Sequence, residues 1–139
     1  MPEPVPLFLA PMAGVTDVAY RLLAREAGAD FTATEFTAAS GLSRQDAKSW
    51  AKVETHPRES PFIPQIFGGV DDEMVETARL LSKDADVIDL NFGCPAPKVT
   101  KTCAGAALMG EPVKLVRMVA RWSEASAVPV SVEMRLGTN

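Results

Sequence analysis

The chain has 139 residues, of which 47% are hydrophobic and 23% are charged, and its formal net charge is −4. These proportions are those of one folded globular domain, and no apolar run approaches the roughly 20 residues that a membrane helix needs. The acidic balance argues against a strong nucleic-acid-binding surface within this chain, because the neutralisation of phosphates needs clustered Lys and Arg. RNA stays possible as a substrate if basic surface is supplied elsewhere.

The first half of the chain alternates predicted strands with predicted helices. An apolar run at residues 5–10 predicts a strand, and a helix capped by Thr16 or Asp17 follows it and ends at Gly28. This helix is expected to bury an apolar stripe made of Ala19, Leu22, Leu23 and Ala27. Residues 31–37 predict a second strand, residues 38–53 are expected to be partly helical, and the proline-containing segment 54–61 is expected to be a loop.

The second half repeats this alternation. Residues 61–67 predict a third strand, and the helix after it is expected to bury Met74, Val75, Ala78 and Leu81. Residues 86–91 predict a fourth strand, which leads into a Gly-Cys-Pro turn and a longer loop to about residue 110. A helix that begins at Pro112 is expected to bury Val113, Val116, Val119 and Ala120. Residues 128–135 predict the fifth strand.

This order of elements predicts an α/β fold with a parallel sheet. No Gly-x-Gly-x-x-Gly follows the first strand, which disfavours a doubly wound dinucleotide-binding domain. The remaining candidate is a TIM (β/α)8 barrel, which takes about 250 residues. Five strands within residues 1–139 therefore predict the N-terminal portion of such a barrel, ending at or just after strand five of eight.

Polar residues occupy the carboxyl ends of the predicted strands, where active sites of parallel barrels form. They are Glu35, Gln65, Asn91, Glu133 and Arg135, and the turn Pro11-Met12-Ala13 closes the first strand. Gln65 and Asn91 could equally satisfy neighbouring backbone groups. Glu133 and Arg135, two apart on one strand face, favour a structural ion pair.

The chain has two cysteines and one histidine, for which we expect different roles. Cys94 lies between Gly and Pro in a turn after a strand, which favours a chemical role, whereas Cys103 beside small residues is expected to pack. His56 is expected to be exposed and inert. The two cysteines lack the spacing of a zinc site, so we expect no metal. The absence of a signal peptide at the start predicts a cytoplasmic location, where both thiols would be free, although a disulfide between them stays open.

A set of short motifs then identifies a family. They are Leu9-Ala-Pro-Met-Ala-Gly-Val-Thr-Asp17, Thr34-Glu35, Pro64-Gln-Ile-Phe-Gly68, Asp89-Leu-Asn-Phe-Gly-Cys-Pro95, Gly105-Ala-Ala-Leu108 and Arg135-Leu-Gly137. In this order and spacing, from Leu7 to Gly137, the chain resembles the tRNA-dihydrouridine synthases. Each motif alone is weak, and Pro-Met-Ala is shared with other flavin barrels.

The resemblance implies a TIM barrel that binds FMN, followed by a helical tRNA-binding domain. It implies that uridine in tRNA is reduced to 5,6-dihydrouridine with NADPH or NADH as the reductant, and that Cys94 donates the proton to C5. Three backbone positions, Pro11, Met12 and Ala13, are then expected to contact the flavin. Gln65 would hydrogen-bond the edge of the isoalloxazine ring, and Asn91 would lie between flavin and uracil.

One residue departs from the family pattern. Strand five of the family carries a lysine that reaches the flavin, and Glu133 stands in its place here. A carboxylate would oppose the negative charge of a reduced flavin, so we expect flavin binding to be weakened or rearranged, with Arg135 able to offset Glu133.

Lys98 and Lys101, downstream of the cysteine, could meet a phosphate.

Two alternatives remain at this point. The first is another FMN barrel, such as a dihydroorotate dehydrogenase, which also places a cysteine near the flavin. The second is an inactive truncated fragment, because the later strands and the helical domain are not within residues 1–139. We expect these 139 residues alone to be inactive and marginally stable, since an open barrel leaves unpaired strand edges.

Overall fold

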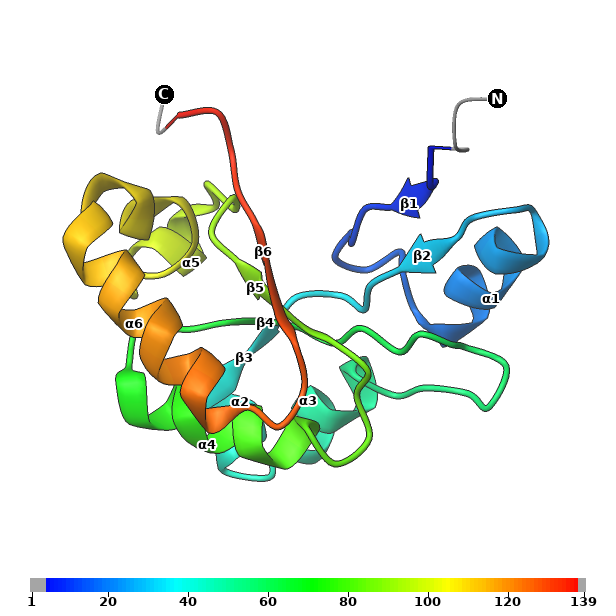
Figure 1. Cartoon of the computed structure of the whole chain (residues 1–139), viewed down its shortest axis with the longest axis horizontal. Helices are drawn as coiled ribbons and strands as arrows, with labels where there is room; N and C mark the ends of the chain where they lie inside the picture. Colours follow the sequence, from blue (N-terminus) through cyan, green and yellow to red (C-terminus); the bar gives the residue numbers. More distant parts are fainter. Residues whose placement is uncertain (1–4, 138–139) are drawn as a thin grey trace.

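The computed structural model describes residues 5–137, which form parallel strands alternating with helices (Figure 1). One small sheet pairs β1 with β2, and a second sheet has the order β3-β4-β5-β6, with every neighbouring pair parallel. The strands are β1 (Phe8–Leu9), β2 (Phe31–Thr32), β3 (Thr37–Ala38), β4 (Gln65–Phe67), β5 (Ile88–Asn91) and β6 (Val130–Glu133). This confirms the α/β class and agrees with part of a TIM barrel. The described residues form no closed barrel, since β1 and β6 each end a sheet.

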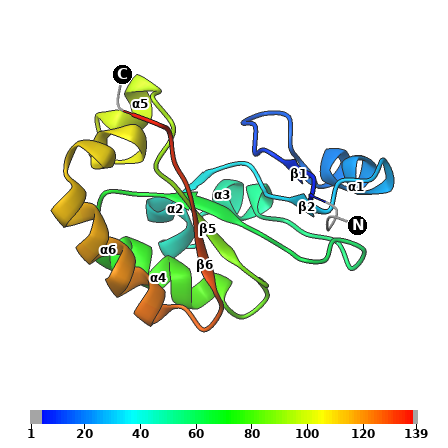
Figure 2. The ribbon, with the colours of Figure 1, turned by 45° about the horizontal axis from the view of Figure 1, so that its top comes forward.

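The helices pack mainly on one side of the four-stranded sheet. They are α1 (Val18–Glu26), α2 (Ala39–Ser43), α3 (Ala47–Lys52), α4 (Asp71–Leu81), α5 (Pro97–Thr100), the 3₁₀ helix η1 (Gly105–Gly110) and α6 (Pro112–Ala125). Figures 1 and 2 show α4 and α6 along this sheet, while β1, β2 and α1 stand apart on its other side. None of the described helices is long and apolar enough to cross a bilayer.

The hydrophobic core lies between this sheet and α2, α4 and α6. Ile66, Ile88 and Leu90 contribute from the strands, and Phe92 stacks on Trp122 with ring centroids 6.1 Å apart. Both rings are at most 2% exposed. The residue that follows β5 is therefore anchored in the core, one step before the Gly-Cys-Pro turn begins.

The strand predicted at residues 31–37 is divided in the structure. β2 pairs with β1 and β3 pairs with β4, and Thr34 lies between the two. The backbone N–H of Thr34 donates to the Ile63 carbonyl at 3.0 Å, and the Thr34 hydroxyl accepts from the Gln65 N–H at 3.0 Å. A side chain thus replaces one rung of the ladder, which propensity alone does not predict.

Of the three predicted apolar stripes, the one on α4 is confirmed and the other two are wrong for most of their residues. Met74, Ala78 and Leu81 of α4 are buried as expected, with Val75 partly buried. On α6 the buried residues are Met118 and Trp122. Of the predicted residues Val119 is partly buried, whereas Val113 and Val116 are 84% and 66% exposed. On α1 the buried residue is Arg21, and Leu23 is exposed. A helix with more than one apolar face does not show from its own sequence which face meets the sheet.

Candidate functional site

Five polar side chains meet on one side of β4, β5 and β6. The parallel register places Gln65 beside Asp89, Asp89 beside Ser131, and Asn91 beside Glu133. Because side chains two apart on a strand share a face, these residues all point away from the helices. We call the set Gln65, Asp89, Asn91, Ser131 and Glu133 the amide–carboxylate cluster.

The cluster is linked by hydrogen bonds between its side chains. The Gln65 amide nitrogen donates to Asp89 Oδ2 at 2.7 Å and to Glu133 Oε2 at 2.5 Å. The Asn91 amide nitrogen donates to Gln65 Oε1 at 3.1 Å and to Glu133 Oε2 at 3.2 Å. The Ser131 hydroxyl donates to Asp89 Oδ1 at 2.5 Å. All four amide hydrogens are therefore used within the cluster.

The hydrogen bond from Cys94 fixes which end of each amide is the donor and which is the acceptor. Its backbone N–H, which can only donate, bonds to Asn91 Oδ1 at 2.9 Å. The Asn91 amide nitrogen must then face Gln65 and Glu133, and Gln65 in turn must present its oxygen to Asn91 and its nitrogen to the carboxylates. Both Asp89 and Glu133 act as acceptors, as ionised carboxylates do.

The backbone of Cys94 is hydrogen-bonded on both sides of its Cα. Its N–H is bound by Asn91, and its carbonyl accepts from the Ala106 N–H at 3.0 Å. Gly105 has φ +59°, and a Cβ there would lie 2.6 Å from the Cys94 carbonyl oxygen, so the close approach requires glycine. The thiol belongs to a half-buried residue at the carboxyl end of β5. This is the position that the sequence predicts for a reactive cysteine.

The turn at residues 11–14 is held by its own contacts and by Glu35. The Met12 N–H donates to the Thr16 hydroxyl at 3.0 Å, and the Met12 carbonyl accepts from the Thr16 N–H at 3.0 Å. Gly14, at φ +76°, donates its N–H to Glu35 Oε2 at 2.6 Å. Glu35 therefore supports this turn from the β2–β3 connection and does not join the cluster.

A small hollow separates the first strand from the cluster. Its volume is about 280 Å³, and it is lined by Phe8, Ala10, Pro11, Asp89, Ser131, Val132 and Glu133. The structure thus brings Pro11 opposite Glu133 and places Glu133 in contact with Gln65 and Asn91. Met12 and Ala13 belong to the neighbouring turn and do not line the hollow.

Three other expectations from the sequence have clear outcomes. No ion pair joins Glu133 to Arg135 within residues 5–137, because Glu133 accepts from two amides and Arg135 is exposed. The packing expected for Cys103 is wrong: its backbone has φ +53° and its side chain is exposed. His56 is exposed as expected.

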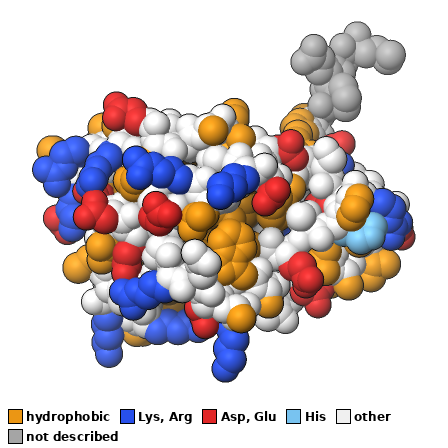
Figure 3. All heavy atoms as spheres, turned by 90° about the horizontal axis from the view of Figure 1, so that it is seen from below, with side chains coloured by type: hydrophobic (Ala, Val, Ile, Leu, Met, Phe, Trp, Pro, Cys, Tyr) orange, Lys and Arg blue, Asp and Glu red, His pale blue; other side chains and the backbone are white. Residues whose placement is uncertain are grey.

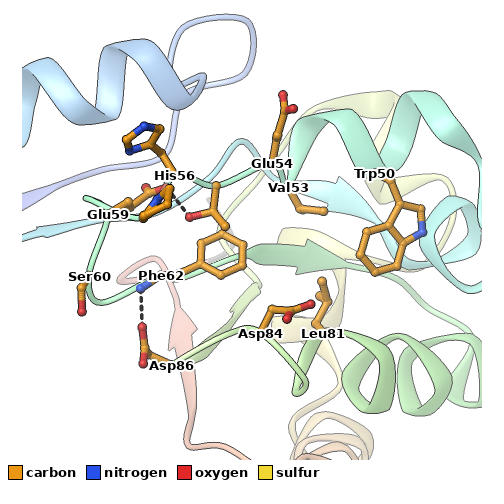
Figure 4. A pocket seen from close by; sticks show the side chains of 12 residues that line it. Trp50, Val53, Glu54, His56, Glu59, Ser60, Phe62, Leu81, Asp84 and Asp86 are labelled. Atoms are coloured by element: carbon orange, nitrogen blue, oxygen red, sulfur yellow. Dashed lines mark hydrogen bonds between the residues drawn. The ribbon is translucent and has the colours of Figure 1, made fainter.

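A larger pocket lies away from this site. It has a volume of about 570 Å³ and is found at the amino-terminal ends of the strands, with Trp50, Val53, Phe62 and Leu81 among its apolar residues (Figure 4). Asp86 in its wall is already bonded to the Phe62 N–H at 2.7 Å. Figure 3, which views the face that carries α2, α3 and α4, shows an apolar patch surrounded by charges of both signs. Reactive groups gather at the opposite strand ends, so we place the site there.

Sequence reasoning did not assign site roles to Asp89 and Ser131. Both lie two residues before an expected site residue, Asn91 and Glu133 respectively, and so share its strand face. The period-two rule was the available signal. What the rule could not supply is the register between strands, which places Asp89 within reach of Gln65 and Ser131.

Comparison with known proteins identifies the family of the chain. A family model described as "Dihydrouridine synthase (Dus)" matches residues 8–139, nearly the whole chain. The chain belongs to the dihydrouridine synthase family. The matched segment includes the turn at residues 11–14, the whole cluster and the Gly-Cys-Pro turn.

Individual relatives are found in bacteria and eukaryotes. A "Probable tRNA-dihydrouridine synthase" of Treponema pallidum is 38% identical over 138 residues, covering 94% of this chain and 41% of the relative. A protein of the same description from Rhizobium leguminosarum is 38% identical over 130 residues, covering 93% of this chain and 41% of the relative. A "tRNA-dihydrouridine(47) synthase [NAD(P)(+)]-like" protein of Rattus norvegicus is 35% identical over 133 residues, covering 94% of this chain and 21% of the relative. The chain thus spans about two fifths of these bacterial relatives and about one fifth of the rat protein.

Proposed function

We propose that this protein reduces uridine to 5,6-dihydrouridine in tRNA, with NADPH or NADH as the reductant. The observation that carries the proposal is the Gly-Cys-Pro turn after β5, which holds Cys94 beside the amide–carboxylate cluster in a chain of this family. We further propose that residues 1–139 form the N-terminal portion of a TIM-barrel catalytic domain. We also propose a cytoplasmic location.

In this proposal Cys94 is the general acid. Reduction of the 5,6 double bond places a hydride on C6 and requires a proton at C5. A thiol is mostly protonated at neutral pH and can donate that proton without a histidine partner. Holding the Cys94 peptide at both its N–H and its carbonyl orients the thiol before the substrate arrives.

FMN is the cofactor that this activity implies, since a flavin carries hydride between a nicotinamide and a carbon centre. The residues around the hollow fit it only in part. Pro11 offers a wall, and the cluster offers acceptor oxygens to a ring N–H. However, Gln65 and Asn91 direct all their amide hydrogens at acceptors of this chain, three at carboxylate oxygens and one at Gln65 Oε1, and no cation bonds to the cluster within residues 5–137. The donors that a flavin carbonyl would need are therefore already engaged, and Met12 and Ala13 lie outside the hollow.

Glu133 accordingly weakens the binding of reduced FMN in this proposal. Its carboxylate faces the hollow, where it opposes negative charge. Replacing it with lysine in the full-length protein should raise flavin affinity and the stability of the reduced flavin, which titration of flavin fluorescence and a reductive titration would measure. Unchanged affinity and reduction would remove this role from Glu133.

Within these residues we assign contact with tRNA to basic residues near the Cys94 turn. Lys98 and Lys101 lie in and just after α5, a few residues past Cys94, and both are exposed. In this proposal they meet backbone phosphates close to the extruded uridine. Extrusion costs a few kcal/mol and exposes both reacting carbons.

The test of the proposed function is the dihydrouridine content of tRNA, measured by mass spectrometry after incubation with the full-length protein, FMN and NADPH or NADH. We expect dihydrouridine to form with the natural protein and to be lost with Cys94→Ala. Cys103→Ala is the matched control, because Cys103 is exposed and outside the cluster. Reduction of orotate without change to tRNA would favour a dihydroorotate dehydrogenase-like enzyme, and no turnover with bound FMN would favour an inactive member.

A further inference from the structure

Besides the bond that it accepts from Gln65, Glu133 makes three contacts with residues 91–93, which lead into the turn that carries Cys94. Its carboxylate accepts from the Asn91 amide at 3.2 Å. Its backbone carbonyl accepts from the Phe92 N–H at 2.9 Å. A Cβ on Gly93 would lie 3.8 Å from Glu133 Oε1, so this carboxylate also lies over the next residue.

We propose that Glu133 is a positioning residue that orients Cys94 through Asn91. This inference rests on the proposed function only for its catalytic consequence, since the hydrogen bonds that carry it belong to the chain itself. It gives Glu133 a second role, which is distinct from its effect on cofactor charge.

The mechanism follows from the bonding capacity of Asn91. Its side chain has one oxygen, which accepts from the Cys94 N–H, and one nitrogen, which donates to Gln65 Oε1 and Glu133 Oε2. Glu133 is the acceptor common to both amides, because Gln65 donates to the same oxygen at 2.5 Å. Without that oxygen, Asn91 loses one of its two acceptors and can turn its amide, and the Cys94 N–H then loses its defined partner.

Two substitutions at Glu133 test the length of its side chain and its charge separately. Glu133→Gln removes the charge but keeps an oxygen at the same length, so it can still accept from both amides. Glu133→Asp keeps the charge but withdraws the oxygen by one methylene, beyond hydrogen-bond reach of at least one amide. A positioning role predicts that Asp disturbs Cys94 and Gln does not, whereas a purely electrostatic role predicts the reverse.

The test is the alkylation rate of individual cysteines in the full-length protein, measured with iodoacetamide and peptide mass spectrometry. Cys103 follows α5 in the same connection between β5 and α6 and is exposed, so it serves as the internal control in every sample. We expect Glu133→Asp to change the Cys94 rate by about fivefold or more and Glu133→Gln to leave it within about twofold, with Cys103 constant. In turnover assays Glu133→Asp should lower kcat while KM for tRNA stays unchanged.

Three results would overturn the inference: no change at Cys94 in either variant, a change in Glu133→Gln alone, or equal changes at Cys94 and Cys103. A variant with Asn91→Ala provides a second route to the same answer. Because Asn91 transmits the effect, adding Glu133→Asp to Asn91→Ala should produce no further change in the Cys94 rate. Failure of the natural protein to form dihydrouridine would contradict the proposed function while leaving these alkylation results to decide the positioning role.

Discussion

At the scale of single residues, Gln65 is the donor that allows two carboxylates to lie together. It is fully buried, and its amide nitrogen bonds to Asp89 and Glu133, which approach it from β5 and β6. Two like charges in a half-buried site repel unless donors are placed between them. An amide on β4 supplies these donors without adding charge.

Changing Gln65 to Glu should therefore destabilise the protein strongly. The substitution removes both donors and adds a third carboxylate, so we expect a loss of about 2–4 kcal/mol in unfolding free energy. Urea denaturation at neutral pH would measure it. Gln45→Glu is the matched control, because Gln45 is exposed and the same change should stay within about 0.5 kcal/mol there. Equal effects at both positions would mean that the cluster does not depend on Gln65.

At the scale of elements, a buried ion pair connects α1 to the loop before β4. Arg21 and Glu59 have side chains at most 1% exposed, and the Arg21 guanidinium bonds to Glu59 through two nitrogens, one of them at 2.8 Å. The same guanidinium donates to the carbonyls of Thr16 and Glu54. One side chain thus joins the start of α1 to the loop on the other side.

Removing the arginine leaves Glu59 buried without its partner. We expect Arg21→Met to cost about 3–5 kcal/mol, because an uncompensated buried charge is expensive. Arg58→Met is the control: Arg58 pairs with Glu26 at 2.8 Å, but the two side chains are 63% and 58% exposed. Its loss should stay below about 1 kcal/mol. Thermal and urea unfolding of the two variants would measure both losses of unfolding free energy. Similar losses would mean that the buried pair stabilises the protein no more than the exposed one.

The short helix α3 depends on a cap whose strength should follow pH. Asp46 accepts from the Ser49 hydroxyl and the Ser49 N–H, and these bonds lower the pKa of its carboxyl below the usual value. Because the pKa is lower in the folded state, the cap stabilises the protein above the pKa of the unfolded chain, and this contribution is lost as pH falls through the folded pKa.

Asp46→Asn tests this cap, since asparagine caps a helix without ionising. The difference in unfolding midpoint between the natural protein and Asp46→Asn should shift in favour of the variant as pH falls from neutral through the acidic range. Asp30→Asn, which changes a carboxylate that accepts from the Leu7 N–H outside any helix, controls for general charge effects. A difference for Asp46 that does not vary with pH would show that ionisation of the cap contributes nothing.

The sequence predicts elements and their strand faces better than it predicts which surfaces meet. Period-two alternation placed Asn91 and Glu133 on the inner face, and the turn chemistry around Cys94 placed the thiol at the strand end. The buried side of α6, by contrast, is set by Met118 and Trp122, which meet Phe92 and the sheet only after long-range packing. Likewise the sequence around Arg21 does not predict its ion pair with Glu59, which lies 38 residues away.

At the scale of the whole molecule, apolar surface gathers where the four-stranded sheet ends. Val132 and Met134 are 42% and 51% exposed, and Leu136 is fully exposed. β6 is also a terminal strand within residues 5–137, so its outer backbone groups have no strand partner there. An unpaired edge with apolar side chains is a template for pairing with another chain. In relatives more than twice as long, further chain is available to cover this edge.

The 139-residue chain expressed alone should therefore self-associate through β6. Adding a charge at the edge opposes strand pairing, so Val132→Lys should reduce the association seen by sedimentation velocity as concentration rises. Val70→Lys is the matched control, because Val70 is 55% exposed and precedes α4 outside any strand. If both variants lowered association equally, net charge would explain the effect. If only Val132→Lys lowered it, the open edge of β6 would be the surface through which the isolated chain associates.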